Sequence, residues 1–254
     1  MSEPIRTSVG TSDADSITVQ GHDLATELMG LVSFTELTFL LARGRMPSEA
    51  EARMLDAVLV SLADHGLTPT VLAARLTYTG APESLQGAVA AGLLGAGSVF
   101  LGVVEDTARF LAAILAGGEG TPESAAAAVE ARLAEGARVP GLGHPVHKVK
   151  DPRTPRMYAL AEETGQLGPH LRLLRLVADA HRERTGRALP INGAGVAGAA
   201  LADLGFPAAL VRGFALVART AGLVGHLAEE MERPLGMQLY RDVDARTTYE
   251  PPGW

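Results

Sequence analysis

The chain has 254 residues, of which 47% are hydrophobic and 20% are charged, and its formal net charge is −7 with a pI of about 5.5. That length and apolar content fit one large domain, which we expect to span residues 1–254, or two closely packed lobes. The acidic balance, without a basic stripe, argues against a nucleic-acid partner and against binding along an anionic membrane surface.

Cysteine is absent from the chain. This excludes disulfides, thiolate metal sites and a cysteine nucleophile, and it fits a reducing cytosol. The N-terminal residues lack the apolar core of a signal peptide, and the apolar run at 87–104 is too short and too rich in glycine for a membrane span. We therefore expect a cytoplasmic protein.

Alanine and leucine dominate the composition and β-branched runs are scarce, which predicts an all-α protein. Residues 15–21 predict a short strand or hairpin, and a 3.6-residue apolar period begins at Asp23. Ser33, with Glu36 three residues later, predicts a capping box and a helix that Gly44 ends. Further helices are expected at about 48–65, 69–77, 82–94, 100–116, 122–136, 155–164, 169–185, 195–204 and 207–231, followed by a polar, proline-rich tail.

Two segments contain too much proline and glycine for regular helix. Residues 139–156 hold four prolines and two glycines among histidine, lysine and arginine, and residues 188–195 form a second irregular patch. Long irregular segments inside a compact domain usually carry function. Within the first segment, His144 follows two glycines and could carry a proton near neutral pH, and Arg153 could hold a carboxylate with two hydrogen bonds. A solvated loop histidine and a solvated arginine are the alternatives.

Residues 141–153, GLGHPVHKVKDPR, resemble the GxGHxVxKxxDPR loop of citrate synthases. Three more segments are similar to the same superfamily in the same order: the stretch from Ile17 to Glu51, LADHG at 62–66, and ARTAGLVGHLAEEMERP at 218–234. The resemblance covers roughly residues 16–240. It implies a citrate synthase-like helical fold with a large and a small lobe, the small lobe at about 140–210, in a homodimer.

The resemblance also implies roles for individual residues. His144 matches the histidine that handles the proton on the oxaloacetate oxygen, and His65 matches a histidine that binds the dicarboxylate. Arg153 and Arg219 match arginines that bind carboxylates within one subunit. Arg233 matches an arginine supplied by the other subunit, which would make a dimer necessary for catalysis.

Two positions depart from citrate synthases proper. Phe100, in GAGSVFLG, stands where those enzymes have a catalytic histidine, and this segment is closer to the citryl-CoA lyase branch, which includes the lyase module of ATP-citrate lyase. Asn192, in PING, stands where the superfamily has a catalytic aspartate. An amide cannot move a proton as a carboxylate does, but it can donate a hydrogen bond to an enolate oxygen.

Coenzyme A is expected to enter as part of the substrate, and no separate cofactor is expected. Lys148 and Lys150 are the only lysines of the chain and could hold CoA phosphates, with simple solvation as the alternative. Gly141 and Gly143 would let the backbone approach the ligand.

The other histidines and one carboxylate have less specific interpretations. His144 and His147 are spaced so that they could share a metal ion, but the sequence offers no evident third ligand, and we expect no metal. His226, at helical spacing from Glu229 and Glu230, is expected either to pack against a neighbouring helix or to form a hydrogen bond near the site. His170, His181 and Asp203 are interpreted as surface positions.

Together these features predict cleavage of citryl-CoA to oxaloacetate and acetyl-CoA, in which His144 removes the hydroxyl proton. Two alternatives stay open: a lyase or synthase for a related 3-hydroxy-acyl-CoA, and a non-catalytic protein that binds CoA or citrate. The expected partners are a CoA thioester, a di- or tricarboxylate and a second copy of the chain.

Overall fold

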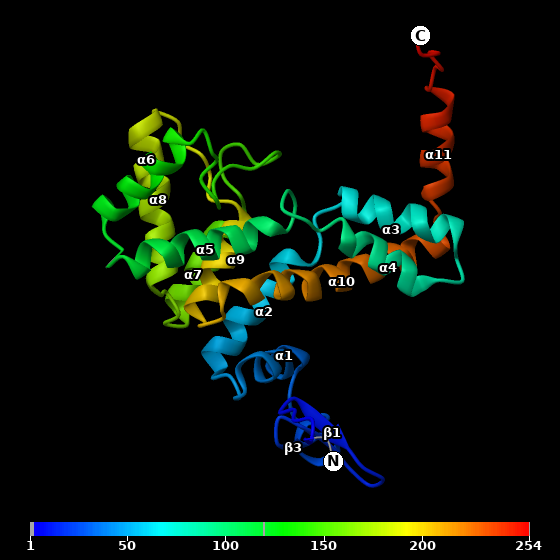
Figure 1. Cartoon of the computed structure of the whole chain (residues 1–254), viewed down its shortest axis with the longest axis horizontal. Coiled ribbons are helices and arrows are strands. Elements are labelled where there is room, and N and C mark those ends of the chain that lie inside the picture. Colours follow the sequence, from blue (N-terminus) through cyan, green and yellow to red (C-terminus); the bar gives the residue numbers. More distant parts are fainter. Residues whose placement is uncertain (1–2, 119, 254) are drawn as a thin grey trace.

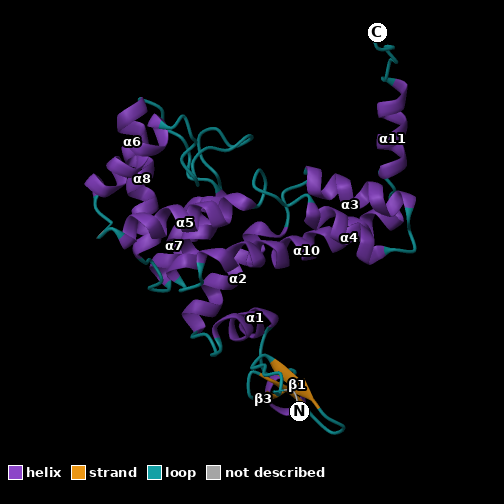
Figure 2. Cartoon of the chain, in the orientation of Figure 1, coloured by secondary structure: helices purple, strands orange, loops and turns teal. Residues whose placement is uncertain are grey.

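The structure is a computed structural model that describes residues 3–118 and 120–253. It is mostly helical (Figure 2), which confirms the predicted helical class and adds one small sheet. The elements in chain order are β1 (Gly10–Ser12), β2 (Ile17–Val19), β3 (His22–Asp23), the π-helical turn η1 (Leu24–Leu28), α1 (Phe34–Arg43), α2 (Glu49–Ala63), α3 (Pro69–Gly80), α4 (Leu85–Leu94), α5 (Gly102–Ala116), α6 (Pro122–Ala134), α7 (Arg153–Glu163), α8 (Pro169–Thr185), α9 (Gly193–Asp203), α10 (Ala208–Glu232) and α11 (Gly236–Ala245).

The N-terminal sheet has three antiparallel strands in the order β1-β2-β3. Gln20 and Gly21 connect β2 to β3 with φ of 50° and 85°, as a two-residue hairpin turn of the mirror-image type requires. The expected hairpin is therefore present, with one strand more than the sequence indicated. In Figure 1 this sheet lies beyond α1, away from the other helices.

Helix starts follow their local sequence closely. Ser33 and Glu36 form the expected capping box at α1, and Thr121 caps α6 with Pro122 at the first helical position. Gly44 ends α1 at a φ of 68°, a left-handed conformation that glycine adopts without strain. These ends depend on neighbouring residues, so they were predictable from the sequence.

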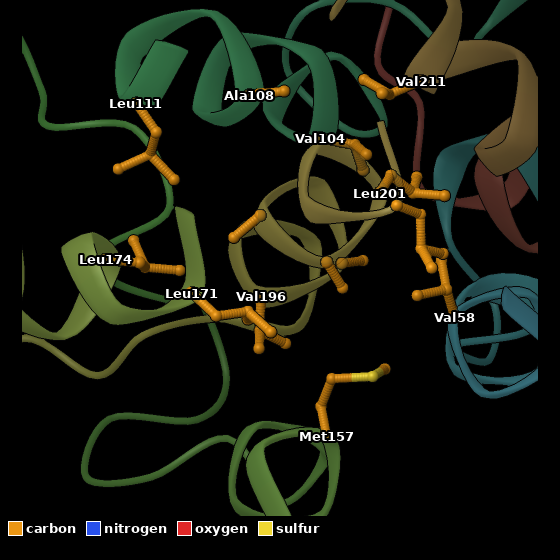
Figure 3. Packing of buried hydrophobic residues seen from close by; sticks show 14 of the residues in the cluster. Val58, Val104, Ala108, Leu111, Met157, Leu171, Leu174, Val196, Leu201 and Val211 are labelled. Carbon is orange, nitrogen blue, oxygen red and sulfur yellow. The ribbon is translucent and has the colours of Figure 1, made fainter. Parts of the chain in front are cut away.

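Helix α9 lies at the centre of the main core. Figure 3 shows Val196 and Leu201 of α9 among apolar side chains from α2, α5, α7, α8 and α10. Small residues on α9 let another segment of the backbone come close. A Cβ on Gly195 would lie 2.7 Å from the carbonyl oxygen of Gly141. The glycine at 195 therefore lets the loop between α6 and α7 rest directly on α9.

Helix α10 connects two apolar clusters. Its first half joins the main core, and its second half packs Leu223 and Leu227 against Val71, Ala74 and Ala88 of α3 and α4. By length and composition alone, α10 is the one helix in the described part of the chain that could cross a membrane. Its packing against α2, α3, α4 and α5 buries part of that apolar surface.

Several details differ from the sequence-based expectations. The tail contains α11, because the Glu230 carboxylate accepts hydrogen bonds from the amides of Leu235 and Gly236 where that helix begins. Helix α7 begins at Arg153, two residues earlier than expected.

His181 is buried, not exposed. Asp203 is also buried, because its carboxylate accepts from the amides of His170 and Leu171 at the start of α8 and contacts the His170 ring. The predicted lobe at 140–210 shares the main core with α2, α5 and α10, and its status as a lobe stays a prediction.

Candidate active site

The two irregular segments lie side by side, as Figure 1 shows above α5 and α9. The amide of Gly143 donates to the carbonyl of Pro190 at 2.8 Å, and the amide of Asn192 donates to the carbonyl of Gly141 at 2.9 Å. Beside them opens a cleft of about 1680 Å³. Its lining includes His65, Phe100, Asp106, Arg109, Arg132, Arg138, Gly141, Gly143, His144, Lys148, Arg153, Arg187, Asn192 and Arg219.

His144 is oriented by the backbone of its own loop. Gly141 and Gly143 have φ of 83° and 80°, so the chain turns tightly just before the histidine. The Nδ1 atom of His144 then accepts hydrogen bonds from the amides of Val146 at 3.1 Å and His147 at 3.0 Å. The neutral ring therefore carries its proton on Nε2, and this nitrogen is a donor toward a ligand.

His65 joins His144 from a distant part of the sequence. It follows the end of α2, and its ring centroid lies 5.1 Å from that of His144 and 5.7 Å from that of His147. Burial is the main cause that lowers the pKa of both His65 and His144; Arg153 and His147, respectively, lower them further. Both rings are therefore neutral near neutral pH.

Arg153 is held by a carboxylate that sequence analysis did not single out. Its Nε and Nη2 atoms donate to the two oxygens of Asp151 at 3.0 and 2.7 Å, and the amide of Gly193 donates to Asp151 at 2.8 Å. Burial alone would raise the pKa of Asp151, but these hydrogen bonds outweigh it and hold the pKa far below its usual range. Asp151 thus joins the loop to α9. Its place beside Arg153 in the DPR motif was the available signal.

Asn192 is buried and caps α9. Its Oδ1 atom accepts from the amide of Gly195, and its Nδ2 atom donates to the carbonyl of Gly143, both at 2.8 Å. A carboxylate could not donate to that carbonyl, so the amide suits this position structurally. One N–H of the side chain remains for a ligand.

Arg219 is the buried cation of the cleft. It is 5% exposed, and its Nε and Nη1 atoms are buried without a hydrogen-bond partner among the described residues. The Asp64 carboxylate lies 3.8 Å from Nη1, within ion-pair distance but beyond a hydrogen bond. Burial lowers the pKa of this guanidinium. Because an unpaired buried donor is unfavourable, the geometry suits an incoming carboxylate.

The remaining expected residues are distributed unevenly. Lys148 lines the cleft and donates to the carbonyl of His144 at 3.2 Å, whereas Lys150 is exposed and is not part of the lining. Arg233 has a side chain that is 78% exposed and pairs with Glu229, outside the cleft of its own chain. The structure adds four arginines that sequence reasoning missed: Arg109, Arg132, Arg138 and Arg187. No local pattern distinguishes them, because only the folding of α5, α6 and two loops brings them together.

Comparison with known proteins decides the family. A model of the citrate synthase C-terminal domain matches residues 11–241. The chain belongs to the citrate synthase family. Curated relatives include the citrate synthases of Haloferax volcanii, 26% identical over 194 residues, and Synechocystis sp., 28% identical over 191 residues. These matches cover 76% and 73% of this chain, but 50% and 46% of the relatives, so the chain spans about half their length.

Solved structures refine this placement. The citryl-CoA lyase from Hydrogenobacter thermophilus is 31% identical with a TM-score of 0.87, and the match covers 98% of this chain and 96% of that one. The ATP citrate lyase from Methanothrix soehngenii, solved with citrate and coenzyme A, is 22% identical with a TM-score of 0.82 and covers all of this chain but 43% of its own. The Thermotoga maritima citrate synthase has a TM-score of 0.69, 20% identity and coverages of 87% and 58%. The expected resemblance to the citrate synthase superfamily, on its citryl-CoA lyase side, is confirmed.

Proposed function

We propose that this family member cleaves citryl-CoA to acetyl-CoA and oxaloacetate. The observation that carries the proposal is the match to a citryl-CoA lyase along nearly the whole of both chains. The cleft supports it with the buried guanidinium of Arg219, two of whose nitrogens have no hydrogen-bond partner among the described residues, beside two neutral imidazoles. The two free carboxylates of citryl-CoA need such cations, and arginine suits carboxylates best.

In this reaction the bond between the thioester methylene and the hydroxyl-bearing carbon breaks. Its electron pair moves into the thioester to form the acetyl-CoA enolate, while the hydroxyl becomes the carbonyl of oxaloacetate and loses its proton. The enolate then takes a proton at carbon. The protein must therefore accept one proton from oxygen, stabilise the enolate oxygen and return one proton to carbon.

The hydrogen bonds of His144 change one sequence-based expectation. Because Nδ1 accepts two amides, we infer that His144 donates through Nε2 to the substrate oxygen and does not take its proton. His65 is the neutral imidazole next to it that can accept that proton. The free N–H of Asn192 would stabilise the enolate oxygen. Asp106 is the only acidic residue among the residues that line the cleft, so water or a histidine would return the proton to carbon.

The carboxylates and the coenzyme would be held at different parts of the cleft. Arg219 would bind a carboxylate directly, and Arg153, fixed by Asp151, would bind a second through its remaining N–H groups. For the coenzyme phosphates we propose Lys148 and the arginines at the cleft wall, namely Arg132, Arg138 and Arg187.

We also propose a homodimer. Exposed apolar residues lie on α3, α10 and α11, among them Leu76, Val224, Met231, Met237 and Tyr240, and a second subunit would cover such a surface. Arg233, which is exposed and is not among the residues that line the cleft of its own chain, would then be available to the partner's cleft. We also expect the protein to act in the cytoplasm, as one of the places where CoA thioesters are used.

A second candidate is a lyase or synthase for a related 3-hydroxy-acyl-CoA. It is favoured by Phe100, which lines the cleft and is 44% exposed, and by the lack of a carboxylate at Asn192. A panel of acyl-CoA substrates would distinguish the two.

The test follows oxaloacetate release from citryl-CoA by the purified protein, with His144→Asn as the matched variant. Turnover that falls by about 100-fold or more in the variant, the usual effect of losing a hydrogen-bond donor positioned at the reacting oxygen, supports the proposal. Citryl-CoA binding without turnover in the wild type would instead favour a CoA- or citrate-binding protein.

A further inference from the structure

His147 has no role in the reaction above, but it forms a cluster with two histidines that do. Among the described residues, His65, His144 and His147 place one ligand nitrogen each within 4.8 Å of one another. The rings of His144 and His147 are stacked at 4.5 Å with an interplanar angle of 28°. Two of these residues come from the loop between α6 and α7, and the third follows α2. The sequence showed the pair but could not show the third imidazole.

From this cluster we propose that the protein binds a divalent transition-metal ion, such as Zn²⁺, Ni²⁺ or Co²⁺, between His65, His144 and His147. Three imidazoles are a complete protein ligand set for such an ion, with a fourth position open. Nitrogens around a tetrahedral ion lie about 3.3 Å apart, so small side-chain rotations would close the site. All three side chains are partly buried, which limits their competition with solvent.

The surroundings define the kind of site. The guanidinium groups of Arg153 and Arg219 lie near the rings, and Asp151 is already paired with Arg153. Hard cations such as Mg²⁺ prefer oxygen ligands. They should therefore bind weakly to three imidazole nitrogens that lie near two guanidinium groups. Softer ions with a strong preference for imidazole are the ones that fit.

His144 also limits how tightly the ion is held. Metal-bound histidines usually donate their other ring N–H to an acceptor. Here Nδ1 faces two amide donors, so coordination through Nε2 would sacrifice both hydrogen bonds. The ion is therefore expected to bind reversibly, unlike a structural zinc ion.

The site has a functional consequence that rests on the proposed function. His65 and His144 are the residues assigned above to the substrate oxygen. An ion bound between them would occupy the same position, so the metal would inhibit cleavage of citryl-CoA.

The experiment titrates the metal-free protein with Co²⁺ alone and follows its visible absorption bands, without any activity measurement. Saturable binding of one ion per chain is expected, weakened at least about tenfold in His147→Asn and in His65→Asn. The backbone amide of residue 147 that orients His144 is retained in the first variant. His22→Asn is the matched control, because His22 lies in β3 of the N-terminal sheet and should leave the titration unchanged.

Unaltered Co²⁺ affinity in both cluster variants, or equal weakening in His22→Asn, would overturn the inference. Displacement of Co²⁺ by Zn²⁺ but not by an equal concentration of Mg²⁺ is the second expected result. A Co²⁺ site whose occupancy does not slow citryl-CoA cleavage would leave the metal inference standing and count against the shared position, so the two proposals fail separately. Circular dichroism of each variant checks that it is folded.

Discussion

The cleft and the contact between α3 and α10 each bury an arginine. The two arginines differ in how far the surrounding carboxylates neutralise their charge. Arg75 on α3 is 2% exposed, and its guanidinium pairs with Glu229 and Glu230 and contacts Nδ1 of His226 at 3.1 Å. Arg219, on the same helix as those partners, is 5% exposed and has two unpartnered nitrogens. The expected packing of His226 against a neighbouring helix is thereby confirmed.

This difference shows how one helix can serve stability and binding. Burying a charge is unfavourable unless it is paired. The fold gives Arg75 two carboxylates within hydrogen-bond distance, whereas among the described residues Arg219 has only the more distant Asp64 carboxylate. The first arginine therefore stabilises the packing of α3 on α10, and the unbonded nitrogens of the second are left to attract a ligand. Replacing each arginine by methionine, which has a similar length and no charge, tests this comparison directly.

Arg75→Met is expected to have the largest effect on stability. It leaves the buried Glu230 carboxylate without its cation, and breaking a buried pair in this way costs about 3–5 kcal/mol. Urea unfolding of both proteins would measure the loss. A variant as stable as the wild type would show that the ion pairs contribute nothing to the packing of these helices.

Arg219→Met should have the opposite profile. Because no described carboxylate depends on it within hydrogen-bond distance, stability should stay within about 1 kcal/mol of the wild type or rise. Loss of a buried charge–carboxylate contact with substrate costs about 2–5 kcal/mol, so kcat/KM should fall by about 30-fold to more than 1000-fold. Steady-state kinetics together with urea unfolding checks both halves, and a large loss of stability would contradict the comparison.

Asp151→Asn tests how much a paired carboxylate contributes to stability, because that contribution should depend on pH. The folded pKa of Asp151 lies below its unfolded value, so its contribution to stability is full above the unfolded pKa and is lost as pH falls through the folded pKa. The variant should be less stable by about 1–3 kcal/mol near neutral pH, and the difference should shrink as the solution is acidified below about pH 4. Unfolding free energies across that range are the measurement. A gap independent of pH would mean that the carboxylate charge is not what matters.

Gly195→Ala should have an effect of similar size, confined to one contact between the loop and α9. The added methyl group would meet the Gly141 backbone, with a Cα at 2.5 Å, and overpacking of this kind costs about 1–3 kcal/mol. Gly213→Ala is the control, because its Cβ would meet only Leu210 at 3.8 Å and alanine favours the helix by about 0.5–1 kcal/mol. Equal melting temperatures for the two variants would show that the loop does not rest on α9.

Local sequence by itself determined much of this protein. The apolar period and the caps at Ser33 and Thr121 placed the helices, because a helix end depends on hydrogen bonds within a few residues. The proline- and glycine-rich segments around His144 and Asn192 identified the loops of the cleft for the same reason. Four motifs in order identified the family.

Only the tertiary structure decided which charges are paired. Arg75 meets Glu230 across 155 positions of sequence, and the Asp151 oxygen that binds Arg153 also accepts from the Gly193 amide of the distant helix α9. The third imidazole of the cluster, His65, and the free guanidinium of Arg219 also depend on contacts between distant helices. Pairing and burial set the pKa and the ligand affinity of such groups, and both depend on distances in space that no local pattern contains.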